Sequence, residues 1–218
     1  DKRTAQYQYD AVGRVIAVKV PDGGVVKLQY NAAGLVTHYT DAAGHTTEYR
    51  YADHLSSQIT ERIDPIGQVL RYQYDSELNL IGLINAKGEQ YSLSYDKDEK
   101  LVQEVGFDGR DQRYQYDIAG NLRAYAQRGE SAWQVTRFQR DPLGRLLGKR
   151  GPDGSFVEFS YDPLSRLVTA TNAHAHLQFE YNPLGQITRE TQNDAVVQYE
   201  HNLIGQRTGT ITPDGERI

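Results

Sequence analysis

The stretch YQYDAVGR, Tyr7–Arg14, decides how this chain folds, because its first four residues recur at Tyr72–Asp75 and at Tyr114–Asp117. The copies begin 65 and 42 residues apart, close to three and two periods of about 21 residues, which indicates a repeat. A relaxed pattern of aromatic or Leu, any residue, aromatic, then Asp or Asn extends the series. Its second aromatic falls at Tyr9, Tyr30, Tyr51, Tyr74, Tyr95, Tyr116, Tyr161 and Tyr181, with Arg140 and His201 in that place in two degenerate units. Ten units therefore cover the chain.

A turn follows each aromatic pair at a fixed distance. The two aromatics are two residues apart, so they lie on the same face of a strand. An Asp or Asn comes next, and a Gly lies four residues after the second aromatic, which predicts a type I turn with a following bulge. The Asp or Asn positions include Asp10, Asp75, Asp96, Asp117, Asp141, Asp162 and Asn182, and the glycines are Gly13, Gly34, Gly120, Gly144, Gly185 and Gly205.

Other residues replace this Gly in four units, at Leu55, Leu78, Glu99 and Ser165. A side chain at a position that needs a positive φ costs roughly 1–2 kcal/mol, so Ser165 is either strained or part of a different turn. Spacings of 23 and 24 residues mark small insertions near Ser56 and near Gly129, the second of which contains the single Trp133.

A second strand and a second Gly-containing turn complete each unit. GRVIAVKV at Gly13–Val20 is one such strand, rich in β-branched residues. All 7 Pro residues fall in one of the two turns, where a missing N–H does not weaken a ladder. We expect no helix. The predicted fold class is all-β, with about ten tandem hairpins in a long, curling antiparallel sheet that forms a spiral, an open shell or a solenoid-like structure.

The composition is lean for a compact domain of this length. Only 38% of the 218 residues are hydrophobic and the mean hydropathy is −0.68, whereas average chains contain roughly 45–50% apolar residues. The 16 Tyr residues offset part of this deficit, since each buries a large ring and keeps its hydroxyl wet or hydrogen-bonded. Rows of half-buried rings fit this composition better than a large apolar core.

Charge and hydropathy exclude several classes of function. The net charge of −5 and the pI near 5.7 give no basic footprint for nucleic acid. No apolar run approaches the roughly 20 residues of a membrane span, and the N-terminus has no signal-peptide pattern. The chain contains no Cys and no Met, even at position 1, so we expect it to be a piece of a longer protein.

No residue pattern predicts an active site, a metal or a cofactor. His174 and His176 are two residues apart and could form half of a zinc site with Glu180, but turn and surface roles explain them as well. The carboxylates mostly occupy a repeated turn position. Exposed rings of the aromatic ladder could stack on sugar faces, although cross-strand packing is the simpler role.

The repeat resembles the YD repeat of the Rhs family on the basis of YQYDAVGR at Tyr7–Arg14 and YQYDIAGN at Tyr114–Asn121. That family includes bacterial Rhs polymorphic toxins, the B and C components of insecticidal toxin complexes, and animal teneurins. The resemblance covers all ten units. It implies a β-sheet that spirals into a shell and, in bacterial members, encloses a C-terminal toxin polypeptide. It also implies secretion or delivery by a bacterial secretion system.

Residues 1–218 are therefore predicted to form a single YD-repeat domain, a fragment of a larger shell without a core-associated or toxin domain. The first hypothesis is a structural, non-catalytic wall whose partners are a toxin polypeptide or adjacent shell segments. The alternative is a surface module that binds carbohydrate or protein through its repeated aromatics. Unpaired strand edges at both ends predict self-association or an occluding terminal segment. Catalysis is the least favoured reading.

Overall fold

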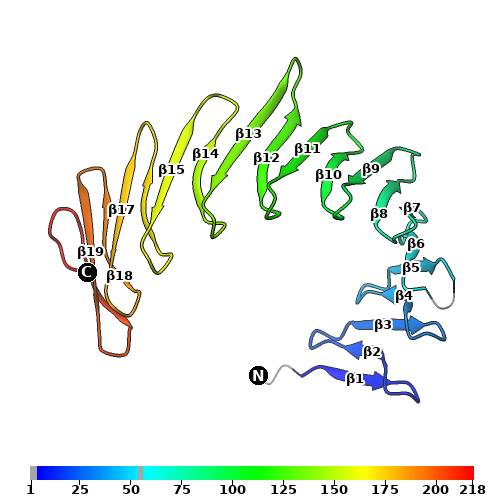
Figure 1. The fold of residues 1–218 in the computed structure, drawn as a ribbon. Helices are drawn as coiled ribbons and strands as arrows, with labels where there is room; N and C mark the ends of the chain where they lie inside the picture. The colour runs from blue at the N-terminus through cyan, green and yellow to red at the C-terminus, as the bar shows by residue number, and fades with distance from the viewer. Residues whose placement is uncertain (1–3, 54–55) are drawn as a thin grey trace. The chain divides into compact units, whose positions relative to one another are not determined.

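A computed structural model describes residues 4–53 and 56–218, and this part of the chain contains twenty strands and no helix (Figure 1). The all-β, antiparallel fold predicted from the repeat is confirmed. Leu55 lies outside the described residues. The chain divides into two compact units, residues 1–111 and 112–218. No helix of the described residues is long and apolar enough to cross a membrane.

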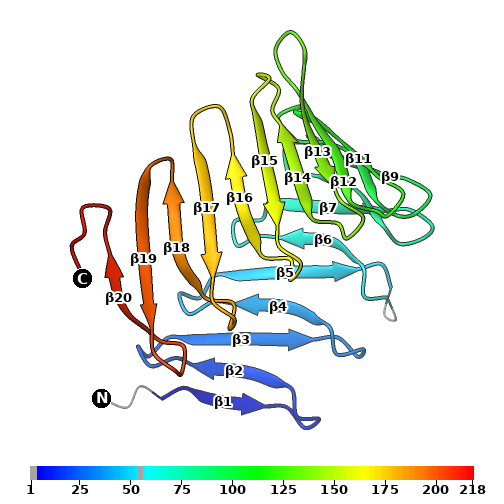
Figure 2. The same cartoon turned by 60° about the vertical axis from the view of Figure 1, so that its left-hand side comes forward.

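Unit 1 is an antiparallel meander in which each strand pairs with the next along the chain. Figure 2 shows its first strands lying side by side. The strands are β1 (Gln6–Tyr9), β2 (Val15–Lys19), β3 (Val25–Tyr30), β4 (Val36–Thr40), β5 (Thr46–Tyr51), β6 (Ile59–Ile63), β7 (Val69–Tyr74), β8 (Leu80–Ile84), β9 (Gln90–Tyr95) and β10 (Leu101–Val105).

Unit 2 is a second meander with the same order of neighbours. The strands are β11 (Asp111–Tyr116), β12 (Leu122–Arg128), β13 (Trp133–Arg140), β14 (Leu146–Arg150), β15 (Phe156–Tyr161), β16 (Leu167–Thr171), β17 (His176–Tyr181), β18 (Ile187–Gln192), β19 (Ala195–His201) and β20 (Arg207–Ile211). The insertion near Gly129 lengthens β12 and β13, so Trp133 pairs with Arg128 at the far end of that hairpin.

The first turn has the predicted geometry. In the first unit the N–H of Gly13 donates to the carbonyl of Asp10 at 3.1 Å, and the N–H of Asp10 donates to the carbonyl of Arg14 at 2.9 Å. Gly13 has a φ of 85°, the left-handed conformation that follows a type I turn in this kind of hairpin. Ser165 keeps the same turn with a φ of 63°, so it carries the expected strain and does not change turn type.

A bulge also interrupts the pairing in all ten first-turn hairpins. In the β1–β2 hairpin Tyr9 pairs with Val15 and Gln8 pairs with Ala17, which leaves Ile16 without a partner. A bulge bends the strand and moves its side chains out of simple alternation. Here it keeps Val15 on the face of Tyr9 while Ala17 shares the face of Gln8.

Hardly any side chain is fully buried, because each unit is a single sheet. Ala124, 8% exposed, is the buried hydrophobic residue among those described. The solvent-accessible surface of 14949 Å² compares with about 10,100 Å² expected for a compact monomer of this mass. The lean composition has this physical basis: both faces of each sheet meet solvent, so there is no interior to fill.

The left-handed turn position gives a matched pair of stability predictions. Leu78 has a φ of 69°, and replacing it with Gly removes strain of roughly 1–2 kcal/mol while adding freedom to the unfolded chain. We therefore expect Leu78→Gly to raise the free energy of unfolding by about 0.5–1 kcal/mol.

Gly88 is the control, because its φ is 81° and a Cβ there would have no atom within 4 Å. Gly88→Ala should lower the free energy of unfolding by about 1 kcal/mol through backbone strain alone. Urea denaturation followed by circular dichroism measures both variants. Equal changes of the same sign would show that positive φ does not limit these turns.

Candidate functional site

The hydroxyl of the second aromatic donates a hydrogen bond where the bulge interrupts pairing between neighbouring hairpins. Pairing of β2 with β3 ends at Ala17 and Lys27, so the carbonyl of Val15 has no strand partner on that side. Tyr30, the last residue of β3, donates its hydroxyl to this carbonyl at 2.7 Å. The second aromatic must therefore be Tyr for this bond, whereas the first aromatic position accepts Phe or Leu.

The same bond recurs through both units. Tyrosine hydroxyls donate to the carbonyl that precedes the bulge in the pairs Tyr51 and Val36, Tyr74 and Ile59, Tyr95 and Leu80, Tyr161 and Leu146, and Tyr181 and Leu167, at distances of 2.6–3.1 Å. All of these tyrosines, and also Tyr9 and Tyr116, are the last residues of their strands. We call this row of residues and their acceptors the tyrosine ladder.

The two degenerate units lack this rung. Arg140 takes the tyrosine position on β13 and donates from Nη1 to the carbonyl of Gly144 in its own turn, at 3.0 Å. His201 takes it on β19, and its buried Nδ1 has no hydrogen-bond partner. Neither side chain joins its hairpin to the one before it by the tyrosine bond.

An arginine after the turn glycine adds a second link between neighbouring units. Arg166 donates from Nε to Asp162 Oδ2 at 2.6 Å and from Nη1 to the carbonyl of Asn182 in the next turn at 3.2 Å. Its guanidinium also lies 4.6 Å from the ring centroid of Tyr181. Arg14 and Arg145 make the equivalent three contacts in their own units.

The turn carboxylates are held by backbone amides. Oδ1 of Asp96 accepts the N–H of Lys100 at 3.0 Å and the N–H of Asp98 at 2.9 Å. The bond from Lys100 is the main reason that the pKa of Asp96 lies below its ordinary value of 3.8. The pKa of Asp117 is lowered mainly by the backbone bond from Asn121. These carboxylates therefore accept hydrogen bonds from backbone amides of their own turns.

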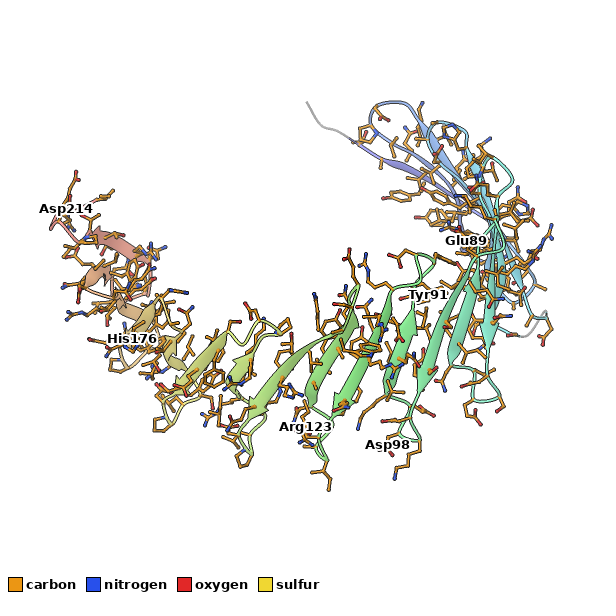
Figure 3. The ribbon with its side chains drawn as sticks, turned by 90° about the horizontal axis from the view of Figure 1, so that it is seen from above. Glu89, Tyr91, Asp98, Arg123, His176 and Asp214 are labelled. Atoms are coloured by element: carbon orange, nitrogen blue, oxygen red, sulfur yellow. The ribbon has the colours of Figure 1, made fainter. Side chains whose placement is uncertain are left out.

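The face opposite the aromatic rings is polar, and in unit 1 it carries a cluster of ion pairs. Arg50 contacts Glu48 at 2.8 Å and Glu61 at 2.9 Å, and Arg71 contacts Glu61 at 3.1 Å. Figure 3 shows that side chains project from both faces of each sheet. Strand alternation therefore produces one aromatic face and one charged face.

The histidine pair of the sequence does not assemble into a metal centre within the described residues. Nδ1 of His176 lies 2.7 Å from the hydroxyl of Thr171, and the backbone of His174 forms a turn bond to Asn172. No group of three or more potential ligands exists in residues 4–53 and 56–218. Carbohydrate binding stays a prediction, and the most exposed rings are the stacked pair Tyr7 and Tyr9, whose centroids are 6.5 Å apart.

The family model of the teneurin YD-shell matches residues 26–169 of this chain, about two thirds of its length. The chain belongs to the YD-shell family. The tyrosine ladder, the turn aspartates and the turn glycines are the residues that give this YD-shell chain its repeat. The resemblance expected from the YQYD motif is confirmed.

Three bacterial toxin proteins are similar in sequence. Double-stranded DNA deaminase toxin A of Burkholderia cenocepacia (strain H111) is 28% identical over 170 residues, which is 74% of this chain and 12% of that protein. Probable deoxyribonucleases RhsA and RhsB of Dickeya dadantii (strain 3937) are 25% and 27% identical, over 70% and 82% of this chain. The YD-shell chain spans only 12%, 10% and 12% of these relatives' lengths.

Solved toxin-complex structures share the fold. The crystal structure of TcdB2-TccC3 matches 94% of this chain with a TM-score of 0.78 at 15% identity, and the chain covers 13% of that structure. TcdB2-TccC3-TEV matches the same share with a TM-score of 0.76 at 16% identity. At this identity the likeness concerns the fold alone.

Sequence reasoning found the repeated residues of the YD-shell chain but missed what the tyrosine hydroxyl does. The signal was present in the letters, because the second aromatic is Tyr in eight units while the first is Phe or Leu in several. The role of the hydroxyl depends on which carbonyl each bulge leaves without a strand partner. That carbonyl can be identified only from the pairing register of the strands.

The tyrosine rung yields a stability prediction. Tyr161→Phe removes the bond to the Leu146 carbonyl and should lower the free energy of unfolding by about 1 kcal/mol. Tyr9→Phe is the matched control, because the Tyr9 hydroxyl has no hydrogen-bond partner among the described residues and its side chain is 57% exposed. The control should change stability by less than about 0.5 kcal/mol. Urea denaturation measures the free energy of unfolding of both variants. Equal losses would show that the tyrosine ladder does not stabilise the fold.

The turn carboxylates predict acid sensitivity. Asp96 and Asp117 have a lower pKa when folded than their ordinary value of 3.8, so each stabilises the fold above that pH. This contribution is lost as the pH falls below 3.8 through the folded pKa. Asn31 accepts the equivalent amide bond from Leu35 without a charge, so Asn can replace these aspartates.

Asp96→Asn with Asp117→Asn should therefore keep the neutral-pH fold and flatten the loss of stability in acid. The measurement is the free energy of unfolding by urea at several values between neutral pH and pH 2.5. A variant that loses stability in acid as steeply as the original chain would contradict the assignment.

Proposed function

We propose that this chain is a stretch of wall in a shell-forming toxin protein, and that it encloses or scaffolds a toxin polypeptide without catalysing a reaction itself. The observation that carries the proposal is the YD-shell match over residues 26–169, together with the toxin-complex fold over 94% of the chain. In this view residues 1–218 are one YD-repeat domain of a larger shell.

The physical properties of the sheet in each unit support a wall. Within each unit the hairpins are joined by strand pairing, and tyrosine bonds such as those of Tyr161 and Tyr181 add a second link at several interfaces. The sheet therefore holds together without a core. A polar face such as that of Arg50, Glu61 and Arg71 would not drive the collapse of an unfolded polypeptide against it. A continuous sheet also blocks passage, since its backbone groups are paired along the length of each hairpin.

The proposal places toxin chemistry outside this chain. The names deaminase and deoxyribonuclease belong to relatives of which the chain covers 12% and 10%. We infer that the matched part is the wall and that the named activities belong to other parts of those proteins. One of these relatives is named a toxin, which supports the further proposal that a bacterial secretion route delivers the protein out of the cell that makes it.

The two sheet edges bear on self-association. β1 pairs with β2 alone among the strands of unit 1, which leaves its other edge as a template for a further strand. At β20 the backbone of Ile218 exchanges two hydrogen bonds with Thr210, at 2.9 and 2.8 Å, and so occupies that edge. We propose that β1 is the edge at which an adjacent shell segment pairs.

Protease protection in the shell-forming protein that carries this stretch tests the proposal. The toxin polypeptide should resist proteinase K in the intact protein and be degraded quickly when produced alone. Tyr161→Ala combined with Tyr181→Ala removes two rungs of the ladder and should speed degradation several-fold, as followed by immunoblotting of the toxin polypeptide.

Leu164→Ser combined with Leu184→Ser is the matched control, because these turn side chains are 71% and 73% exposed and support no packing. The control should protect the toxin polypeptide as well as the original protein does. Equal degradation of the toxin polypeptide in the intact protein and on its own would show that this wall encloses nothing.

A further inference from the structure

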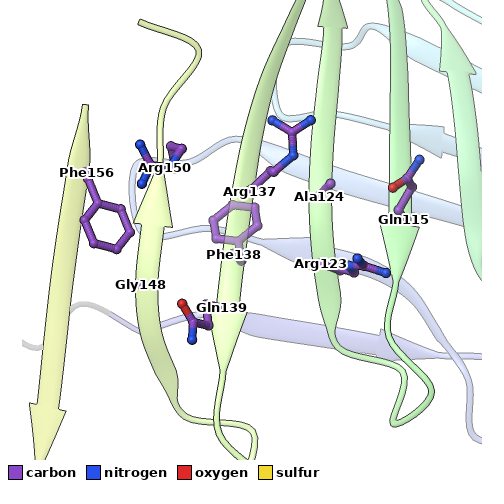
Figure 4. Close-up of a pocket in the computed structure, with 9 residues that line it drawn as sticks. All are labelled: Gln115, Arg123, Ala124, Arg137, Phe138, Gln139, Gly148, Arg150 and Phe156. Carbon is purple, nitrogen blue, oxygen red and sulfur yellow. The ribbon is translucent and has the colours of Figure 1, made fainter. Parts of the chain in front are cut away.

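A hollow of about 320 Å³ lies on unit 2, over strands β11 to β15. Figure 4 shows how its lining side chains are arranged. They are Gln115, Arg123, Ala124, Arg137, Phe138, Gln139, Gly148, Arg150 and Phe156. We call this feature the arginine hollow.

Small residues make the floor of the arginine hollow. Ala124 pairs with Arg137, and Gly148 pairs with Gln139, so both small residues share a face with longer side chains. Gly148 has an ordinary negative φ, and a Cβ at this position would lie 3.1 Å from the ring of Phe156. The glycine is therefore needed for close approach of the ring, which forms one side of the hollow.

The three arginines of the hollow have no carboxylate partner among the described residues. Arg123, Arg137 and Arg150 form no ion pair within 4.0 Å. Arg150 makes a cation–π contact with Phe156, whose ring centroid lies 4.8 Å from the guanidinium carbon. Arg137 and Arg150 also stand directly opposite each other in the β13–β14 register. Like charges directly opposite each other destabilise a strand pair. An anion bound between the two guanidiniums would offset this repulsion.

Two arginines of unit 1 show that this chain can pair a guanidinium with a carboxylate on its charged face. The same charged face holds Arg50 and Arg71, and both contact Glu61 within 3.1 Å. The Arg50 side chain is 55% exposed, so exposure by itself does not explain why the arginine hollow has no carboxylate. In a chain of net charge −5, three guanidiniums without a carboxylate partner among the described residues gather around one hollow.

A second hollow of about 260 Å³ adjoins the first and shares Gln139 and Phe156 with it. Its lining includes the hydroxyl-bearing Ser160, Thr169 and Thr171, together with Glu158. The combined surface is basic at one end and offers hydroxyls and a carboxylate at the other. A ligand that fits both must extend across several strands and carry its negative charge at the arginine end.

We propose that the arginine hollow binds a carboxylate side chain of an extended acidic polypeptide segment, whose adjoining residues lie along the second hollow. Guanidinium groups bind carboxylates through two parallel hydrogen bonds, which gives both strength and orientation. The amide of Gln139 between the two hollows can meet a peptide backbone group. This inference goes beyond the proposed function, since it holds whether or not the wall encloses a polypeptide.

The test is fluorescence polarisation with a short labelled peptide that has Glu residues at one end and Ser residues at the other, and a matched peptide in which Gln replaces each Glu. The Glu peptide should bind the chain at low ionic strength and weaken as salt is added, while the Gln peptide should not bind. Arg137→Gln and Arg150→Gln should each weaken binding of the Glu peptide by about tenfold.

Arg62→Gln is the matched control, because it removes the same charge from an exposed residue of unit 1 that lines neither hollow. Thermal unfolding checks the fold, and Arg137→Gln should not lower the midpoint, because it removes the opposition with Arg150.

Three results would overturn the proposal. The first is equal binding of the Glu and Gln peptides, and the second is an equal loss of binding with Arg62→Gln. The third is full displacement of the Glu peptide by free glutamate or inorganic phosphate at matched charge concentration, which would make the hollow a general small-anion site.

Discussion

The hydrogen bond from a tyrosine hydroxyl to the carbonyl before a bulge is the interaction on which this architecture depends. Each first-turn hairpin contains a bulge, and pairing with the next hairpin stops short of it, as at Ala17 and Lys27. The carbonyl of Val15 would otherwise lack a protein partner, and Tyr30 supplies one. The tyrosine of the repeat thus supplies a hydrogen bond at the place where the bulge of a neighbouring repeat interrupts strand pairing.

Stability in this chain is local because there is no core to distribute it. Each hairpin contacts its neighbours, so the free energy is close to a sum of repeat and nearest-neighbour contributions, as in other repeat proteins. The links contributed by Tyr181 and Arg166 recur at several interfaces. The units with Arg140 and His201 lack the tyrosine bond, so strand pairing joins them to the preceding hairpin without it.

The two faces of each sheet have separate tasks. The aromatic face contains the tyrosine ladder, which joins neighbouring repeats. The second aromatic position is therefore Tyr in eight of the ten units. The opposite face does not contribute to the tyrosine ladder, and its charges differ between the units. Arg50 and Glu61 form an ion pair in unit 1, whereas Arg137 and Arg150 lie opposite each other without a carboxylate partner in unit 2. A sheet built in this way can change the chemistry of one face repeat by repeat without changing its fold.

The sequence by itself determined the all-β class, the ten-unit repeat and the place of each first turn, because Asp10 and Gly13 act on backbone within four residues of themselves. It also determined that Ser165 would carry strain if the turn were kept. Only the tertiary structure decided which carbonyl Tyr30 reaches and which arginines meet on one face. Those facts depend on pairing register across strands, since a single bulge changes which side chains share a face, and no local pattern of letters records that change.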